Sequence, residues 1–186
     1  MHCRTEQEAE AVKAALQARL AEYGLEMHPT KTRIVYCKDG KRRGRYPNVT
    51  FDFLGYQFRP HMVQNAQDGS LFCSFVPAVS PSALKSMRST VRDLNIAQRT
   101  HLSLADIAEK LNPLLRGWIG YYGRYAPSQV GPMLRHVNLT LRRWVMRKFK
   151  RFAGRTVAAA RFLERLVRTR NNLFVHWRIG MIGAFA

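Results

Sequence analysis

The chain has 186 residues, of which 46% are hydrophobic and 11% aromatic. A chain of this length buries roughly 70% of its unfolded surface, and this composition is too apolar for an intrinsically disordered segment, so a globular fold is expected. The 31 Lys and Arg exceed the 12 Asp and Glu, which gives a net charge of +19. This charge favours a polyanionic partner, and nucleic acid is the leading candidate.

The positive charge is concentrated in the C-terminal part. Residues 1–78 contain 11 Lys and Arg and 8 Asp and Glu, whereas residues 79–186 contain 20 and 4. The three cysteines lack CxxC spacing and a paired histidine, which predicts neither a disulfide framework nor a zinc site. Without a recognisable signal peptide or an apolar stretch of about 18 residues, we expect a cytoplasmic protein with no membrane partner.

The N-terminal part begins with the pattern of an amphipathic helix. Thr5 and Glu8 have the spacing of a capping box, and apolar residues follow at helical spacing. Gly24 can supply the left-handed stop. The sequence therefore predicts a helix over residues 6–23.

Short segments rich in β-branched and aromatic residues predict antiparallel strands between residues 32 and 77. The expected strands are 32–37, 49–58, a segment near 62–64, and 71–76. Asp-Gly dipeptides at 39–40 and 68–69 mark turns between them.

The pattern changes to helices after Ser80-Pro81, an N-cap residue followed by proline at the first helical position. We therefore divide the chain into residues 1–78 and an all-α bundle over 79–186, which makes the expected fold α+β. At Asn112-Pro113 a helix should end and a new one begin, because proline lacks an amide proton and asparagine is a good cap. The helices are expected over 81–96, 103–111, 112–127, 128–152 and 156–169.

The helix expected over 128–152 has a core face and a cationic stripe. Apolar residues including Leu134, Leu141 and Trp144 fall on one side at about 100° per residue. A charged helix face is most often merely solvated, but residues 110–163 contain no Asp or Glu. We therefore expect this stripe to bind phosphates through Arg135, Arg142, Arg143, Arg147 and Lys150.

Two further basic clusters are candidates for RNA binding. One lies on the next helix and consists of Arg161, Arg165 and Arg168. The other lies in a predicted loop, where RNA contact and an ordinary solvated loop are both open, and consists of Lys41, Arg42, Arg43 and Arg45.

The aromatic residues near position 120 have two interpretations. Stacking on unpaired bases is one. Core packing is favoured for Trp118, Tyr122 and Tyr125, which continue the apolar phase of the preceding residues, and Tyr121 is the expected exposed exception. No carboxylate pair or histidine arrangement indicates catalysis, so spacing alone does not predict an enzyme.

Three stretches, in this order, resemble group II intron reverse transcriptase/maturase proteins. Residues 24–32 (GLEMHPTKT) and 53–56 (FLGY) resemble the last blocks of the polymerase palm. Residues 111–122 (LNPLLRGWIGYY) resemble the maturase-specific motif. The resemblance implies the end of a palm over 1–78 and a thumb-like maturase domain over 79–186. It also implies binding of intron RNA for splicing and of a template–primer duplex.

The resemblance also assigns roles to individual residues. Lys31 corresponds to the lysine thought to assist pyrophosphate departure. The primer-gripping turn corresponds to Phe53, Leu54, Gly55 and Tyr56. The maturase motif supplies Asn112, Pro113, Arg116, Gly117, Trp118, Tyr121 and Tyr122.

The aspartate turn that holds the metal ions in such polymerases has no counterpart in this sequence. The role of Lys31 is therefore latent, and this chain alone is expected to have no polymerase activity, metal site or cofactor. Mg²⁺ is expected only in the complete polymerase, and the chain resembles the C-terminal piece of a longer protein.

Other interpretations remain open at this point. The chain can be a subunit of a split polymerase that a separate fingers and palm chain completes. It can also be a non-specific nucleic-acid-binding protein. A basic element that coats anionic membranes is disfavoured, because the neighbouring helices offer its apolar face a core.

Overall fold

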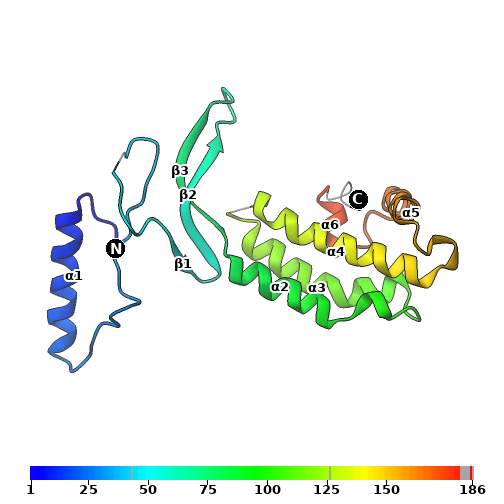
Figure 1. The fold of residues 1–186 in the computed structure, drawn as a ribbon, viewed down its shortest axis with the longest axis horizontal. Helices are drawn as coiled ribbons and strands as arrows, with labels where there is room; N and C mark the ends of the chain where they lie inside the picture. The colour runs from blue at the N-terminus through cyan, green and yellow to red at the C-terminus, as the bar shows by residue number, and fades with distance from the viewer. Residues whose placement is uncertain (43, 126, 181–184, 186) are drawn as a thin grey trace. The chain divides into compact units, whose positions relative to one another are not determined.

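The computed structural model describes residues 1–42, 44–125, 127–180 and 185 (Figure 1). A short three-stranded sheet is followed by helices, which confirms the α+β class. The chain forms two compact units. Unit 1 comprises residues 1–51 and 58–76, and unit 2 comprises residues 52–57 and 77–186.

The first helix, α1 (Glu6–Ala21), begins where the sequence predicts. The Thr5 hydroxyl accepts a hydrogen bond from the Glu8 amide at 3.2 Å, and the Glu8 carboxylate accepts one from the Arg4 amide at 2.8 Å. No residue of α1 is buried, and Leu16 is 44% exposed. The expected amphipathic packing is therefore wrong, because this alanine-rich helix has few large apolar side chains to bury.

The sheet has the strand order β1 (Phe51–Phe53), β2 (Tyr56–Gln64) and β3 (Leu71–Val79). The single strand expected over 49–58 is wrong, because Leu54 and Gly55 have φ angles of 49° and 78°. Two positive φ angles in succession are typical of a two-residue hairpin turn. The expected turn at Asp68-Gly69 is present, and the Asp68 carboxylate accepts from the Ser70 amide at 2.9 Å.

The strand expected over 32–37 is absent. The Tyr36 amide donates to the Asn48 carbonyl at 2.8 Å, but the Lys38 amide donates back to the Tyr36 carbonyl at 2.9 Å. This local turn prevents the continuous ladder that a strand requires. The Tyr36 ring packs instead against Tyr46, with 4.3 Å between ring centroids.

Unit 2 is built around α4, which contacts α2, α3 and α5. Two of its helices start at the caps that the sequence predicts: the Ser80 hydroxyl accepts from the Ala83 amide, and Ser103 and Asp106 form a reciprocal capping box. The predicted core face of α4 is confirmed, since Leu134, Leu141 and Trp144 are buried. The helical elements are α2 (Pro81–Asp93), η1 (Ile96–Gln98), α3 (Leu104–Tyr122), α4 (Pro127–Lys148), η2 (Lys150–Phe152), α5 (Thr156–Thr169) and α6 (Val175–Arg178).

The helix break expected at Asn112-Pro113 is wrong, because α3 runs through Pro113 without interruption. The Asn112 side chain does not cap a new helix. Its amide donates to the Leu173 carbonyl at 3.0 Å, and its oxygen accepts from the Val175 amide at 3.0 Å. Asn112 thus joins α3 to the start of α6, and the buried side chains of α3 compensate for the bond that proline cannot make.

The helix expected over 128–152 ends at Lys148. Phe149 leaves the helical conformation, with φ −111° and ψ 111°, and its ring lies between those of Trp144 and Phe162 at centroid distances of 6.1 and 6.0 Å. The aromatic contact with α5 therefore ends α4 earlier than periodicity predicts. No helix among the described residues is long and apolar enough to cross a membrane.

Candidate nucleic-acid interface

The cationic stripe predicted on α4 is present only in part. Arg135, Arg143 and Arg147 are exposed on this helix. Lys150 is also exposed, but it lies in η2 after the helix has ended, so it does not continue the row.

Arg142 has a structural contact in place of the phosphate contact that the sequence predicts. Its Nη1 donates to the Phe185 carbonyl at 2.6 Å, and its Nε is buried without a hydrogen-bond partner among the described residues. The side chain is half-buried. The guanidinium therefore joins α4 to Phe185, and less of it is exposed to solvent than of Arg143 and Arg147.

Two arginines of α2 complete the basic surface of α4. Burial lowers the pKa of His136, and the positive charges of Arg88, Arg143 and Arg92 lower it further. These three exposed guanidinium groups therefore lie close enough to one histidine to act on its charge. We name the four exposed arginines of these two helices the α2–α4 basic face: Arg88, Arg92, Arg143 and Arg147.

Arg88 and Arg92 were not among the basic residues predicted from the sequence. The signal was nevertheless present, because Lys85, Arg88 and Arg92 recur at helical spacing and Met87 and Val91 lie on the buried side. Helical periodicity, which predicted the stripe on α4, predicts this row on α2 as well.

A hollow lies beside this face, with a volume of about 760 Å³. Arg143 and Arg147 line it together with the thioether side chain of Met146. The remaining lining residues are small: Ala97, Ala153, Gly154 and Thr156. Two guanidinium groups beside a partly apolar lining suit a nucleotide, because the guanidinium groups can contact its phosphate and the apolar lining can contact its base.

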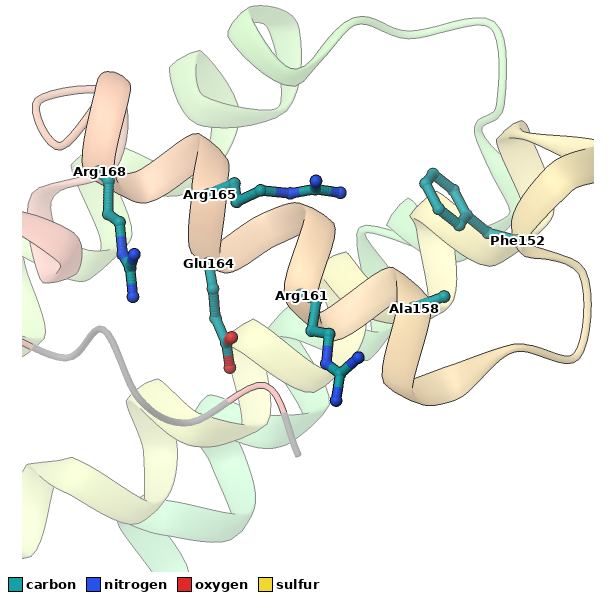
Figure 2. A pocket seen from close by; sticks show the side chains of 6 residues that line it. All are labelled: Phe152, Ala158, Arg161, Glu164, Arg165 and Arg168. Atoms are coloured by element: carbon teal, nitrogen blue, oxygen red, sulfur yellow. The ribbon is translucent and has the colours of Figure 1, made fainter.

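The arginines of α5 line a second, smaller hollow of about 420 Å³ (Figure 2). Arg165 extends toward Phe152, whereas Arg161 and Arg168 extend away from it, on the same side as Glu164 (Figure 2). The three arginines are exposed but do not form one continuous row, and Glu164 adds a negative charge between them.

The basic loop of unit 1 is exposed at Lys41, Arg42 and Arg45. The Arg42 guanidinium lies 6.0 Å from the centroid of the Tyr36 ring. Arg43 lies outside the described residues. Lys31 is exposed as well, and its side chain makes no hydrogen bond or ion pair among the described residues.

The primer-grip-like turn packs against the end of the maturase motif within unit 2. The Tyr56 hydroxyl donates to the Tyr121 carbonyl, and the Tyr121 hydroxyl donates to the Leu54 carbonyl at 2.8 Å. A Cβ at Gly55 would lie 2.5 Å from the Tyr122 hydroxyl oxygen, so only glycine fits there. Sequence reasoning did not predict this contact between two motifs that are 65 residues apart.

Burial separates the aromatic residues near the end of α3. Tyr122 is buried and Tyr121 is 47% exposed, as expected. Trp118 is only half-buried. The core position expected for Tyr125 is wrong, because it follows the end of α3 and is 60% exposed.

A polar cluster under α4 is fully buried. Trp177 Nε1 can only donate, so the atom that it meets at 3.1 Å is the Asn138 carbonyl oxygen, and His176 Nε2 must donate to the same oxygen at 2.7 Å. Nδ1 of His176 then carries no proton, and it has no hydrogen-bond partner among the described residues. Burial lowers the pKa of His176 to about 3, so the imidazole is neutral.

The described residues contain no group of three or more His, Cys, Asp or Glu side chains that could hold a metal ion.

The helices from α2 to α5 thus define an all-helical domain with a basic face. Residues 84–163 match the family described as the maturase-specific domain of group II introns. This match supports a group II intron maturase family for this part of the chain, which contains the whole α2–α4 basic face and the end of α3. No curated protein and no solved structure gave a match.

Proposed function

We propose that this chain binds group II intron RNA through the α2–α4 basic face and so supports the folded intron during splicing. The observation that carries the proposal is the packing of α2 against α4, which brings Arg88, Arg92 and Arg143 close enough to His136 to lower its pKa. The whole of α4 contains no Asp or Glu, so no side chain on that helix competes with a phosphate for these cations.

Guanidinium groups suit this task because they bind phosphate oxygens through paired, charge-assisted hydrogen bonds. Contacts to phosphates position an RNA without reading its sequence. In this proposal the intron RNA supplies the chemistry of splicing, and the protein neutralises phosphates and holds neighbouring helices of the RNA together.

Template–primer binding is a second candidate, and one specific observation favours it. Leu54, Gly55 and Tyr56, which resemble a primer-gripping turn, are held against Tyr121 and Tyr122. Polymerase activity would then require the fingers and the catalytic palm from a separate chain. Nucleotide incorporation after co-expression with such a chain, and none by this chain alone, would support this candidate.

Splicing of a group II intron RNA with and without the full chain tests the main proposal. We expect the chain to accelerate splicing at low Mg²⁺, where the RNA fold is weakest. The variant Arg88→Gln/Arg92→Gln/Arg143→Gln/Arg147→Gln should lose this effect. Equal acceleration by the wild type and this variant would contradict the proposal.

A matched control removes the same number of charges from unit 1. The chain offers four exposed cations there for substitution by Gln: Lys31, Lys41, Arg42 and Arg45. This control should keep most of the acceleration, because its charges lie outside the α2–α4 basic face.

A further inference from the structure

The end of α3 exposes two tyrosine rings that the α2–α4 basic face does not use. Tyr121 and Tyr125 are 47% and 60% exposed, although each packs against the buried Tyr56 at centroid distances of 5.3 and 6.1 Å. Leu54, in the adjoining turn, is 67% exposed. Apolar surface gathered in this way is typical of a binding site.

The Tyr121 ring is fixed in the free protein. Its hydroxyl donates to the Leu54 carbonyl, and its own backbone carbonyl accepts from the Tyr56 hydroxyl. The Tyr122 ring meets it edge-on, with 4.8 Å between centroids and 88° between planes. A ring that is already ordered loses little conformational entropy when it binds a ligand.

The charges around these rings favour a polyanion over an apolar protein surface. The Arg124 guanidinium lies 5.5 Å from the centroid of the Tyr125 ring. Residues 110–163 contain no Asp or Glu, so no acidic side chain of this end of α3 or of the helix that follows would repel an anion. An occupant with both flat apolar faces and negative charges fits this surface, and unpaired nucleotides have both.

We propose that Tyr121 and Tyr125 form a stacking platform for unpaired bases of a single-stranded RNA segment, with Arg124 beside the adjoining phosphate. The inference rests on the proposed function, because it requires the chain to bind RNA. It assigns a different task to a different surface, since the rings contact bases and the α2–α4 basic face contacts phosphates.

Two RNA strands of equal length and charge separate base contacts from phosphate contacts. One is an ordinary single-stranded oligonucleotide, and the other has the same backbone with abasic positions. Stacking on aromatic rings strengthens binding measurably for each base, so the full chain should bind the ordinary strand at least about tenfold more tightly.

Paired variants then assign this difference to the rings. Tyr121→Leu/Tyr125→Leu keeps apolar volume but removes both π faces, and Tyr121→Phe/Tyr125→Phe keeps the faces but removes the hydroxyls. The Leu variant should bind both strands equally, and the Phe variant should retain the tenfold preference. Circular dichroism and thermal unfolding of the same samples establish that both variants are folded.

The outcomes distinguish failure of this inference from failure of the proposed function. Binding of neither strand would overturn both. Tight, salt-dependent binding of both strands with equal affinity by the wild type would leave the proposed function intact and overturn the stacking platform. A Leu variant that keeps the preference for bases would overturn the platform as well. So would a Leu variant whose only change is its elution volume in size exclusion, because the tyrosines would then serve contact between copies of the chain.

Discussion

Units 1 and 2 differ in how much apolar surface they bury. Every buried hydrophobic residue among the described residues belongs to unit 2, and none belongs to unit 1. Strands and an alanine-rich helix without a buried core contribute little to offset the entropy lost on ordering the chain. The two units therefore share one chain but not one source of stability.

Charge follows the same division. Residues 79–186 hold 20 Lys and Arg against 4 Asp and Glu, and repulsion among like charges destabilises a compact state. The helices around α4 tolerate this repulsion because Trp144, Trp177 and Phe174 are buried among them. The most basic part of the molecule is therefore also the part with the core.

Hydrogen exchange should show the largest difference between the two units. Amides in α3 and α4 should exchange at least about 1,000-fold more slowly than amides in α1, which corresponds to roughly 4 kcal/mol in opening free energy. Mass spectrometry of the full chain measures both regions in one sample. Equal protection in α1 and α4 would contradict the conclusion that unit 2 is the more stable unit.

Core truncation should affect the two units differently. Trp144 is buried, and its Nε1 donates to the Arg99 carbonyl at 3.1 Å. Trp144→Ala should lower the free energy of unfolding by about 3–5 kcal/mol because it leaves a cavity and an unpaired carbonyl. Leu16→Ala in α1 is the matched truncation, and denaturant unfolding should show a cost of less than about 1 kcal/mol. Similar costs for both would mean that α1 has a core of its own.

The pH dependence of the free energy of unfolding tests the stability of unit 2 through its buried residue His176. Its folded pKa is about 3 and its unfolded pKa is about 6.5, so the unfolded state binds more protons between these values. The neutral imidazole therefore makes its full contribution to the free energy of unfolding above pH 6.5. As the pH falls below this value, the contribution is lost by about 1.4 kcal/mol per pH unit, or roughly 3 kcal/mol by pH 4. The lowered pKa of His136 acts in the same direction.

His176→Gln is the control for this dependence. The Gln amide can donate to Asn138 as the imidazole does, but it does not titrate. Its unfolding free energy should fall less steeply between pH 7 and pH 4. Equal slopes for the wild type and this variant would show that His176 does not protonate on unfolding.

Asn112 offers a smaller and more specific test. Asn112→Ala removes two hydrogen bonds and should cost about 2 kcal/mol. Asn112→Asp distinguishes a bridge from a helix cap, because Asp caps as well as Asn but would face the Leu173 carbonyl with a second acceptor. We expect the Asp variant to be nearly as unstable as the Ala variant in denaturant unfolding. An Asp variant of wild-type stability would favour the cap.

The starts of helices could be predicted from the sequence, but contacts with residues far along the chain could not. Thr5, Ser80 and Ser103 cap helices through residues three positions away, so their signals are local. The bridging contacts of Asn112 and Arg142 were not predicted, because their partners Leu173 and Phe185 lie 43 or more residues further along the chain. The spacing of these residues contains no information about those contacts.

The candidate site follows the same rule. Exposure of Arg135, Arg143 and Arg147 could be predicted from helical periodicity within α4. The proximity of Arg143 to Arg88 and Arg92 could not be predicted, because it depends on how α2 packs against α4. Periodicity can find each basic row but not which rows come together.

The salt dependence of RNA binding tests the central claim most directly. If four guanidinium groups of the α2–α4 basic face contact phosphates, a fourfold rise in salt should weaken binding through them about fiftyfold, at a slope of about −0.7 per contact. The variant Arg88→Gln/Arg92→Gln/Arg143→Gln/Arg147→Gln should lower the magnitude of the slope by about three units. The unit 1 variant, which loses Lys31, Lys41, Arg42 and Arg45, should change it much less. An unchanged slope in the first variant, or equal changes in both, would contradict the assignment of RNA binding to the α2–α4 basic face.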